Sequence, residues 1–151
     1  MATFMGAIGS DRHDFIVLSK AIQDGKDRAT GKPVITIVED DTLVLRSLAR
    51  LIRAAGYRVL AFESAEEFLE STQAGEVACA ILDLQLPGMS GLELQARLAA
   101  ANCRVPIVFV TAHDEPETRA QALQNGAIAF FGKPLKDDDL LEVIDSAVGN
   151  S

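Results

Sequence analysis

Five short apolar runs, each followed by a stretch with helical periodicity, constrain the fold of this chain more than any other feature. The runs cover residues 34–38, 57–62, 79–82, 107–110 and 128–131. The third run shows no alternation of polar and apolar residues, which is typical of a strand buried on both faces of a sheet. Strands that alternate with helices form parallel sheets with helices on both faces. The pattern therefore predicts an α/β domain with a five-stranded parallel sheet.

The stretches between the runs predict helices with recognisable ends. The first helix, over residues 43–55, ends at Gly56. Its apolar stripe consists of Val44, Leu48, Leu51, Ile52 and Ala55. Ser64, with Glu67 three residues later, predicts a capping box at the start of the second helix. Further helices are predicted over residues 92–101, 115–124 and 137–148.

Length and composition are those of one domain. A chain of 151 residues with 48% hydrophobic content can bury its own core. Residues 1–32 stand apart as an N-terminal extension, interpreted as a short helix and a polar linker, and the regular pattern occupies residues 33–151. Cys79 and Cys103 lie in or beside apolar runs and are interpreted as small buried apolar groups, not as a disulfide.

Charge and hydropathy exclude several classes of protein. The formal net charge of −8 argues against a nucleic-acid surface, because phosphate contacts need clustered Lys and Arg. No apolar run approaches the roughly 18 residues that span a bilayer, and residues 1–10 lack the pattern of a signal peptide. We expect a cytoplasmic chain without direct nucleic-acid or membrane contact, whose partners are proteins or small phosphorylated molecules.

Polar residues follow four of the five predicted strands. Glu39 and Asp40 follow the first strand, Asp83 the third, Thr111 the fourth, and Lys133 the fifth after a one-residue spacer. A flavodoxin-like, doubly wound sheet with strand order 2-1-3-4-5 would align these residues along one edge. Ligands and chemistry gather at that edge in open α/β sheets, so Asp83 is a candidate nucleophile or metal ligand.

The charge of this predicted edge favours a magnesium site. Carboxylates about 5 Å apart repel each other by roughly 3 kcal/mol per pair at an effective dielectric constant near 20, so Glu39, Asp40 and Asp83 together require a cation. Mg²⁺ fits because it accepts a few carboxylates, keeps water ligands and leaves room for phosphate oxygens. Lys133 and the hydroxyl of Thr111 can then hold the remaining oxygens of a phosphoryl group during its transfer.

Four motifs resemble one protein family. They are Val38-Glu39-Asp40-Asp41, Asp83 within Leu-Asp-Leu-Gln-Leu-Pro-Gly-Met-Ser-Gly, Val110-Thr111-Ala112, and Gly126-Ala127 through Phe130 to Lys133-Pro134. Their order and spacing are similar to those of the receiver domain of bacterial two-component response regulators. The resemblance covers about residues 33–149 and implies the flavodoxin-like fold.

The resemblance implies roles for the acidic residues. Asp83 would accept a phosphoryl group from a sensor histidine kinase, a histidine phosphotransfer protein or a small phosphodonor. Asp40, Asp83 and the backbone carbonyl of Gln85 would bind Mg²⁺. Glu39 matches a position that acts on the metal through a water, where Asp is also usual. The chain would not be an enzyme acting on other molecules, since it would catalyse only its own phosphorylation and dephosphorylation.

The resemblance also implies how a signal leaves the site. Lys133 would pair with the phosphate, and the Lys133-Pro134 peptide bond would be cis. Thr111 and Phe130 match a pair whose coordinated shift reports phosphorylation. Gln85 and His113, each two residues after a site residue, are expected to tune the lifetime of the phosphoryl group.

The expected output surface comprises the helix over residues 115–124, the strand over 128–131 and the helix over 137–148. Glu117, Gln121, Phe130 and Leu141, or their neighbours, would contact a downstream protein or a second copy in a homodimer.

Each residue also has a simpler interpretation. Taken alone, Asp83 is typical of a loop start, Asp41 of a helix cap, Lys133 of a solvated lysine and Phe130 of a core residue. Their joint placement at successive strand ends favours the functional interpretation.

Two other functions are alternatives. A phosphatase of the haloacid dehalogenase type also uses a strand-end Asp, but it needs a second acid where this chain has Gln85. The chain ends at Ser151, directly after the last predicted helix. It would therefore be either a stand-alone receiver or the receiver portion of a longer DNA-binding response regulator.

Overall fold

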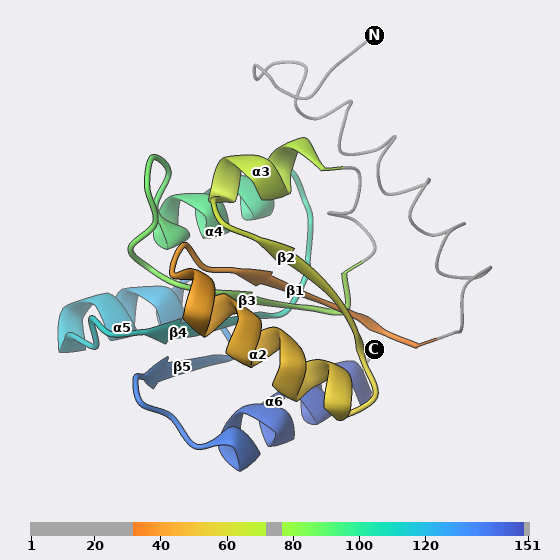
Figure 1. Ribbon diagram of the computed structural model, residues 1–151. Helices are drawn as coiled ribbons and strands as arrows, with labels where there is room; N and C mark the ends of the chain where they lie inside the picture. Colours follow the sequence, from red (N-terminus) through yellow and green to blue (C-terminus); the bar gives the residue numbers. More distant parts are fainter. Residues whose placement is uncertain (1–31, 72–76, 150–151) are drawn as a thin grey trace, which may run out of the picture.

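The computed structural model describes residues 32–71 and 77–149, so the predicted extension over residues 1–32 lies almost entirely outside the described residues. Its centre is a five-stranded parallel sheet (Figure 1). The strands are β1 (Val34–Val38), β2 (Arg58–Phe62), β3 (Cys79–Leu82), β4 (Ile107–Thr111) and β5 (Ala129–Gly132). Their order is β2-β1-β3-β4-β5, which confirms the predicted flavodoxin-like sheet.

Helices cover both faces of the sheet, as predicted (Figure 1). On one face lie α2 (Thr42–Ala54) and α6 (Asp137–Gly149). The other face carries α3 (Ala65–Glu70), α4 (Gly91–Ala100) and α5 (Pro116–Gln124). Successive strand residues supply the two cores in turn: Ile81 packs toward α2 and α6, whereas Leu82 packs toward α3 and α4. The sheet is thus buried on both sides, which explains its continuous apolar runs.

Short polar side chains begin three of the helices. Asp41 caps α2 by accepting hydrogen bonds from the backbone N–H groups of Leu43 and Val44. Ser90 and Glu93 form a complete capping box at α4.

The capping box predicted at Ser64 forms only in part. The Ser64 hydroxyl accepts from the Glu67 N–H, as expected. The Glu67 carboxylate, however, accepts from the backbone of Glu63, one residue before the cap.

Two details of the predicted elements are wrong by about one residue. The buried stripe of α2 consists of Leu45, Leu48, Ala49 and Ile52, with the predicted Val44 and Leu51 half-buried against the same core. Ala55 is exposed at the helix end. Strand β5 begins at Ala129, which pairs with Val108, so Ile128 lies before the ladder and is 46% exposed. In both cases the boundary depends on packing against a neighbouring strand, which periodicity in the sequence does not define.

The two cysteines lie in or beside the core as apolar groups, as the sequence predicts. Cys79 is buried and Cys103 is half-buried, and neither forms a disulfide within the described residues. Burial raises the pKa of Cys79 to about 12, as expected for a core thiol inside β3. Within residues 32–71 and 77–149, no helix has the length and apolar character needed to cross a membrane.

Candidate phosphoryl-acceptor site

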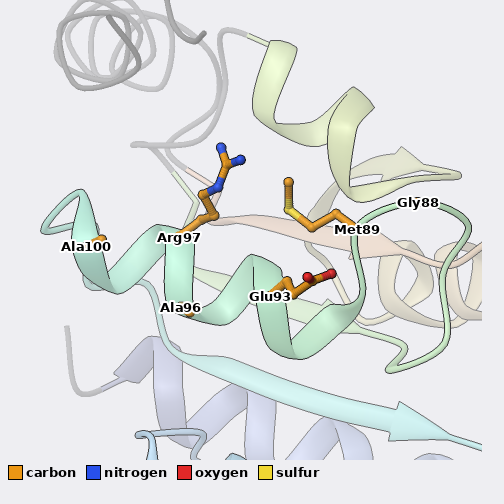
Figure 2. Close-up of a pocket in the computed structure, with 6 residues that line it drawn as sticks. All are labelled: Gly88, Met89, Glu93, Ala96, Arg97 and Ala100. Atoms are coloured by element: carbon orange, nitrogen blue, oxygen red, sulfur yellow. The ribbon is translucent and has the colours of Figure 1, made fainter. Parts of the chain in front are cut away.

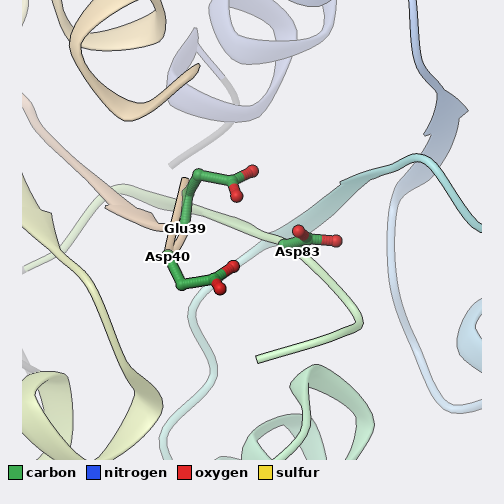
Figure 3. A group of neighbouring side chains, drawn as sticks. All are labelled: Glu39, Asp40 and Asp83. Carbon is green, nitrogen blue, oxygen red and sulfur yellow. The ribbon is translucent and has the colours of Figure 1, made fainter. Parts of the chain in front are cut away.

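Three carboxylates meet at the carboxyl end of the sheet. Strand β1 runs beside β3 with Val38 opposite Leu82, so the residues that follow these strands are neighbours. Glu39 and Asp40 follow β1 and Asp83 follows β3 (Figure 3). One oxygen from each of the three side chains lies within 4.8 Å of the others. The structure therefore brings together the three acids predicted to share a cation.

The surroundings differ among the three carboxylates. Glu39 is 2% exposed and Asp83 is 7% exposed, whereas Asp40 is open to solvent. The backbone holds the two buried acids in place, because Glu39 N–H donates to Phe62 O and Asp83 N–H donates to Val38 O, both at 3.0 Å. The result is a pocket with two fixed buried acids and one acid at its mouth.

Lys133 comes directly after β5, and its side chain extends into this pocket. Its ammonium nitrogen lies 2.8 Å from Glu39 Oε1 and 3.7 Å from Asp83 Oδ2. Its backbone N–H donates to Thr111 O at 2.8 Å, and the Lys133–Pro134 peptide bond is cis. The lysine therefore pairs most closely with Glu39 while remaining within reach of Asp83.

Burial and charge act against each other on this pair. Burial raises the pKa of Glu39, although the hydrogen bond from Lys133 opposes the shift. Burial alone would lower the pKa of Lys133, but the hydrogen bond to Glu39 and the charge of Asp83 raise it overall. The lysine thus remains protonated because its partners are anionic.

The donor set fits a hard divalent cation. Three carboxylates and one ammonium leave the pocket with a formal surplus of negative charge. Carboxylate oxygens are the ligands that Mg²⁺ prefers, and the open position of Asp40 leaves room for water ligands. Glu39, Asp40 and Asp83 could therefore hold Mg²⁺, with the surplus charge as the attractive force.

Thr111 and Phe130 lie on adjacent strands beside the pocket. Thr111 ends β4 and is fully buried, and its Oγ1 accepts a hydrogen bond from His113 N–H at 3.0 Å. Phe130, in β5, is 4% exposed and packs against Phe109 with 5.9 Å between ring centroids. The two residues predicted to form a switch are both buried, one strand apart.

Gln85 and His113 lie on the exposed loops after β3 and β4. The backbone nitrogen of Gln85 is 3.4 Å from Asp83 Oδ1, at the long limit of a hydrogen bond.

The sequence of this chain matches a known protein family and several of its members. The family model described as the response regulator receiver domain matches residues 35–145. The chain belongs to this family. Nodulation protein W of Bradyrhizobium diazoefficiens is 41% identical over 125 residues, which is 83% of this chain and 55% of that protein. The response regulator protein TmoT of Ectopseudomonas mendocina is 42% identical, over 76% of this chain and 52% of that protein. The chain therefore spans about half the length of these relatives.

Solved receiver structures share the fold. The crystal structure of FixJ-N superposes with a TM-score of 0.71 at 31% identity, covering 80% of this chain and 96% of that one. The response regulator StyR superposes with a TM-score of 0.73 at 39% identity, covering 79% of this chain and 60% of that one.

Two close approaches in this receiver escaped the sequence analysis because they depend on the path of the loop after β3, which no local pattern defines. A Cβ atom at Gly91 would lie 2.2 Å from Asp83 O, so only glycine lets α4 begin this close to the acidic residue. Glu66 of α3 accepts a hydrogen bond from Met89 N–H at 2.7 Å, which ties the loop after Asp83 to α3. A glycine directly after the Ser90 cap was the one signal in the sequence.

A separate hollow of about 500 Å³ lies over α4 and the loop before it (Figure 2). Its lining residues are Gly88, Met89, Glu93, Ala96, Arg97 and Ala100. None of the three clustered carboxylates lines it, so this hollow is distinct from the acidic pocket of the receiver.

Proposed function

We propose that this receiver is a phosphorylation-activated switch in which Asp83 accepts the phosphoryl group. The observation that carries the proposal is the placement of Asp83, a nearly buried carboxylate with two other acids within 4.8 Å and the Lys133 ammonium 3.7 Å from its Oδ2. A carboxylate attacks phosphorus well only where the new negative charge is neutralised. In this pocket, the ammonium of Lys133 neutralises that charge from one side.

The proposed reaction is a simple displacement. An Asp83 oxygen forms a bond to phosphorus while the bond from phosphorus to the donor breaks, and the donor leaves with the electron pair. Lys133 then turns from Glu39 toward the phosphoryl oxygens, which carry about two negative charges. The Thr111 hydroxyl, whose oxygen already accepts from His113, donates its hydrogen to another phosphoryl oxygen.

Mg²⁺ supports this reaction in the proposal. Glu39, Asp40, Asp83 and the Gln85 backbone carbonyl would hold it. When bound, the ion neutralises charge on the transferred phosphoryl group. The chain itself positions the nucleophile, excludes bulk water from Glu39 and Asp83, and supplies the ammonium of Lys133.

The partners are part of the proposal. The donor is a sensor histidine kinase, a histidine phosphotransfer protein or a small acyl phosphate, in the cytoplasm. The chain acts on no substrate beyond its own phosphorylation and dephosphorylation, whose rate Gln85 and His113 tune from their exposed loops.

The output passes through Thr111 and Phe130 to the surface formed by α5, β5 and α6. Attraction of Thr111 to the phosphoryl group shifts the loop after β4, and Phe130 responds on the next strand. Glu117 and Gln121 on α5 and Leu141 on α6 border this surface, which would contact a downstream protein or a second copy of the chain.

A second candidate function follows from the relatives' names and lengths. Some relatives are described as transcriptional regulatory protein FixJ, and the first relatives are about twice as long as the matched region. The alternative is that this receiver is one part of a longer response regulator. The other part would bind DNA and control transcription.

Mass spectrometry of the intact protein tests the proposal. Incubation with acetyl phosphate and Mg²⁺ should add one phosphoryl group to the wild type and none to Asp83→Asn. Asp138→Asn, an exposed residue of α6, is the matched control and should be labelled like the wild type. Asp40→Ala should be labelled more slowly. Continued labelling of a folded Asp83→Asn variant would refute the assignment.

A further inference from the structure

Helix α5 is held to the receiver by few contacts. Its buried residue is Ala122, whose carbonyl accepts a hydrogen bond from the Gln95 side chain of α4 at 3.0 Å. At the other end of the helix, Arg119 makes three contacts that link α5 to the two neighbouring segments. Since little apolar surface anchors α5, these polar contacts contribute a large share of what holds the helix in position.

Arg119 joins an acid and an aromatic ring. Its Nε donates to Asp114 Oδ1 at 3.1 Å and its Nη2 donates to Asp114 Oδ2 at 2.9 Å, so the planar guanidinium pairs with both carboxylate oxygens. The same guanidinium carbon lies 5.0 Å from the centroid of the Phe130 ring. The Phe130 ring therefore contacts both the Phe109 ring and the Arg119 guanidinium.

Asp114 connects this contact to the loop that follows Thr111. The loop passes over the end of β5, where a Cβ atom at Gly132 would lie 2.8 Å from Asp114 Oδ2. Gly132 immediately precedes Lys133. The Asp114 carboxylate thus lies against the backbone next to the site lysine and three residues from the site threonine.

An exposed ion pair usually contributes little to stability. Here the side chains of Arg119 and Asp114 are 41% and 39% exposed, so the global stability of the fold depends weakly on them. Their position gives them a different role, because both lie on segments that the proposed switch moves. A small energy is sufficient to shift a balance between two local arrangements.

We infer that Asp114 and Arg119 form a latch that positions Phe130 in its buried orientation and holds the loop after Thr111 against β5. Both are positioning residues, and neither touches the phosphoryl group. The inference rests on the proposed function and adds that the buried ring of Phe130 belongs to the arrangement that phosphorylation favours. The latch thereby adjusts how much of that arrangement the receiver adopts at a given level of phosphorylation.

Removing the latch should shift the orientation of the ring. A cation over an aromatic face and a paired exposed arginine together correspond to a factor of roughly 3 to 10 in a two-state ratio. Arg119→Gln should lower the ratio of buried to outward Phe130 by that factor. Asp114→Asn should act in the same direction, and the double variant should show no further shift, because the two residues act as one unit.

The conservative variant separates the parts of the latch. Arg119→Lys keeps a cation near the ring but loses the planar pairing with Asp114, so it should give an intermediate ratio. Arg46→Gln removes an exposed arginine from α2, on the opposite face of the sheet, and serves as the matched control. It should leave the ratio unchanged.

NMR measures the ratio directly. Three-bond couplings to the Phe130 ring carbon report its side-chain rotamers, first without and then with beryllofluoride and Mg²⁺. The apparent affinity for beryllofluoride should fall in each latch variant by the same factor as the buried fraction, because only that fraction is competent. Circular dichroism verifies that every variant is folded.

The outcomes separate the two ideas. If the wild type binds no beryllofluoride, the proposed function is wrong, whatever the latch does to the ring. If the wild type binds it but the rotamer ratio of folded Arg119→Gln equals that of the wild type, the latch is wrong. Additive shifts in the Asp114→Asn and Arg119→Gln pair would also overturn it.

Discussion

Helices α2 and α5 lie on opposite faces of the same sheet and are anchored in opposite ways (Figure 1). Both lie entirely within the described residues. Helix α2 buries Leu45, Leu48, Ala49 and Ile52, and Asp41 caps its start. Helix α5 buries Ala122 and leaves Leu123 41% exposed, and the side chain of its N-cap residue, Glu115, makes no capping hydrogen bond among the described residues.

The difference in packing between α2 and α5 matches the different positions of the two helices relative to the acids and the proposed output surface. The acids Glu39 and Asp40 directly precede the firmly packed α2, so the pocket is built on a rigid support. The loop after Thr111 leads directly into α5, which has little apolar anchoring. A weakly anchored element is where a small change at the site produces a large movement. The receiver thus places its firmly packed helix, α2, beside the acids and its weakly anchored helix, α5, within the proposed output surface.

The largest expected effect tests the difference in packing. Ile52→Ala in α2 should lower the free energy of unfolding by about 3 to 4 kcal/mol, because it leaves a cavity in a fully buried position. Leu123→Ala in α5 should lower it by about 1 kcal/mol or less, since that residue is 41% exposed and its truncation leaves no enclosed cavity. Urea denaturation measures both. Similar losses in the two variants would remove the contrast between the helices.

A smaller effect concerns the helix starts. Asp41→Ala should lower the free energy of unfolding by about 1 kcal/mol, because two N–H groups of α2 lose their acceptor. Glu115→Asp should raise it by up to about 1 kcal/mol, because the shorter acid reaches the first free N–H groups of α5. Thermal unfolding measures both changes. If Glu115→Asp also slows amide exchange throughout α5, the weak start of that helix contributes to its mobility.

The smallest effect depends on pH and concerns the α2 side of the molecule. The hydroxyl of Tyr57, just after α2, donates to Asp145 of α6. Burial, together with this hydrogen bond and the charge of Asp145, raises the pKa of Tyr57 from 10.0 to about 12. The folded protein therefore holds the phenolic proton more tightly than the unfolded chain. The resulting stabilisation is complete below pH 10 and is lost as the pH rises toward 12.

Tyr57→Phe should therefore lower the free energy of unfolding by less than about 1 kcal/mol at pH 8. Between pH 10 and 12 its stability should decline less steeply than that of the wild type. Urea denaturation across this pH range provides the comparison. Equal slopes for the two proteins would show that the contact between Tyr57 and Asp145 does not link α2 to α6.

Much of the fold followed from local patterns. The five apolar runs correspond to the five strands, and the positions of the helices follow from periodicity and from end signals such as Asp41 and Gly56. The errors occur where a neighbour decides the boundary, as at Ile128, or where a side chain has two backbone groups to choose between, as at Glu67.

The candidate site was accessible from the sequence for a similar reason. In a parallel sheet, residues that follow adjacent strands become neighbours, so Glu39, Asp40 and Asp83 could be grouped before their distances were known. Contacts made by residues that do not come directly after a strand could not be predicted from the sequence. The position of Arg119 over Phe130 depends on how α5 packs, and the closeness of Gly91 to Asp83 depends on the angle at which α4 leaves the sheet.

The sequence by itself determined the α/β architecture, because periodicity and chain direction are local properties that the parallel sheet repeats. The strand order implied by the family resemblance then grouped the polar residues at the carboxyl edge. Tertiary structure alone decided that Lys133 pairs more closely with Glu39 than with Asp83, that Phe130 is buried, and that Arg119 covers it. These three results depend on side-chain positions across strands and helices. Such positions are set by packing and by competition among charges in one pocket, which no single stretch of sequence contains.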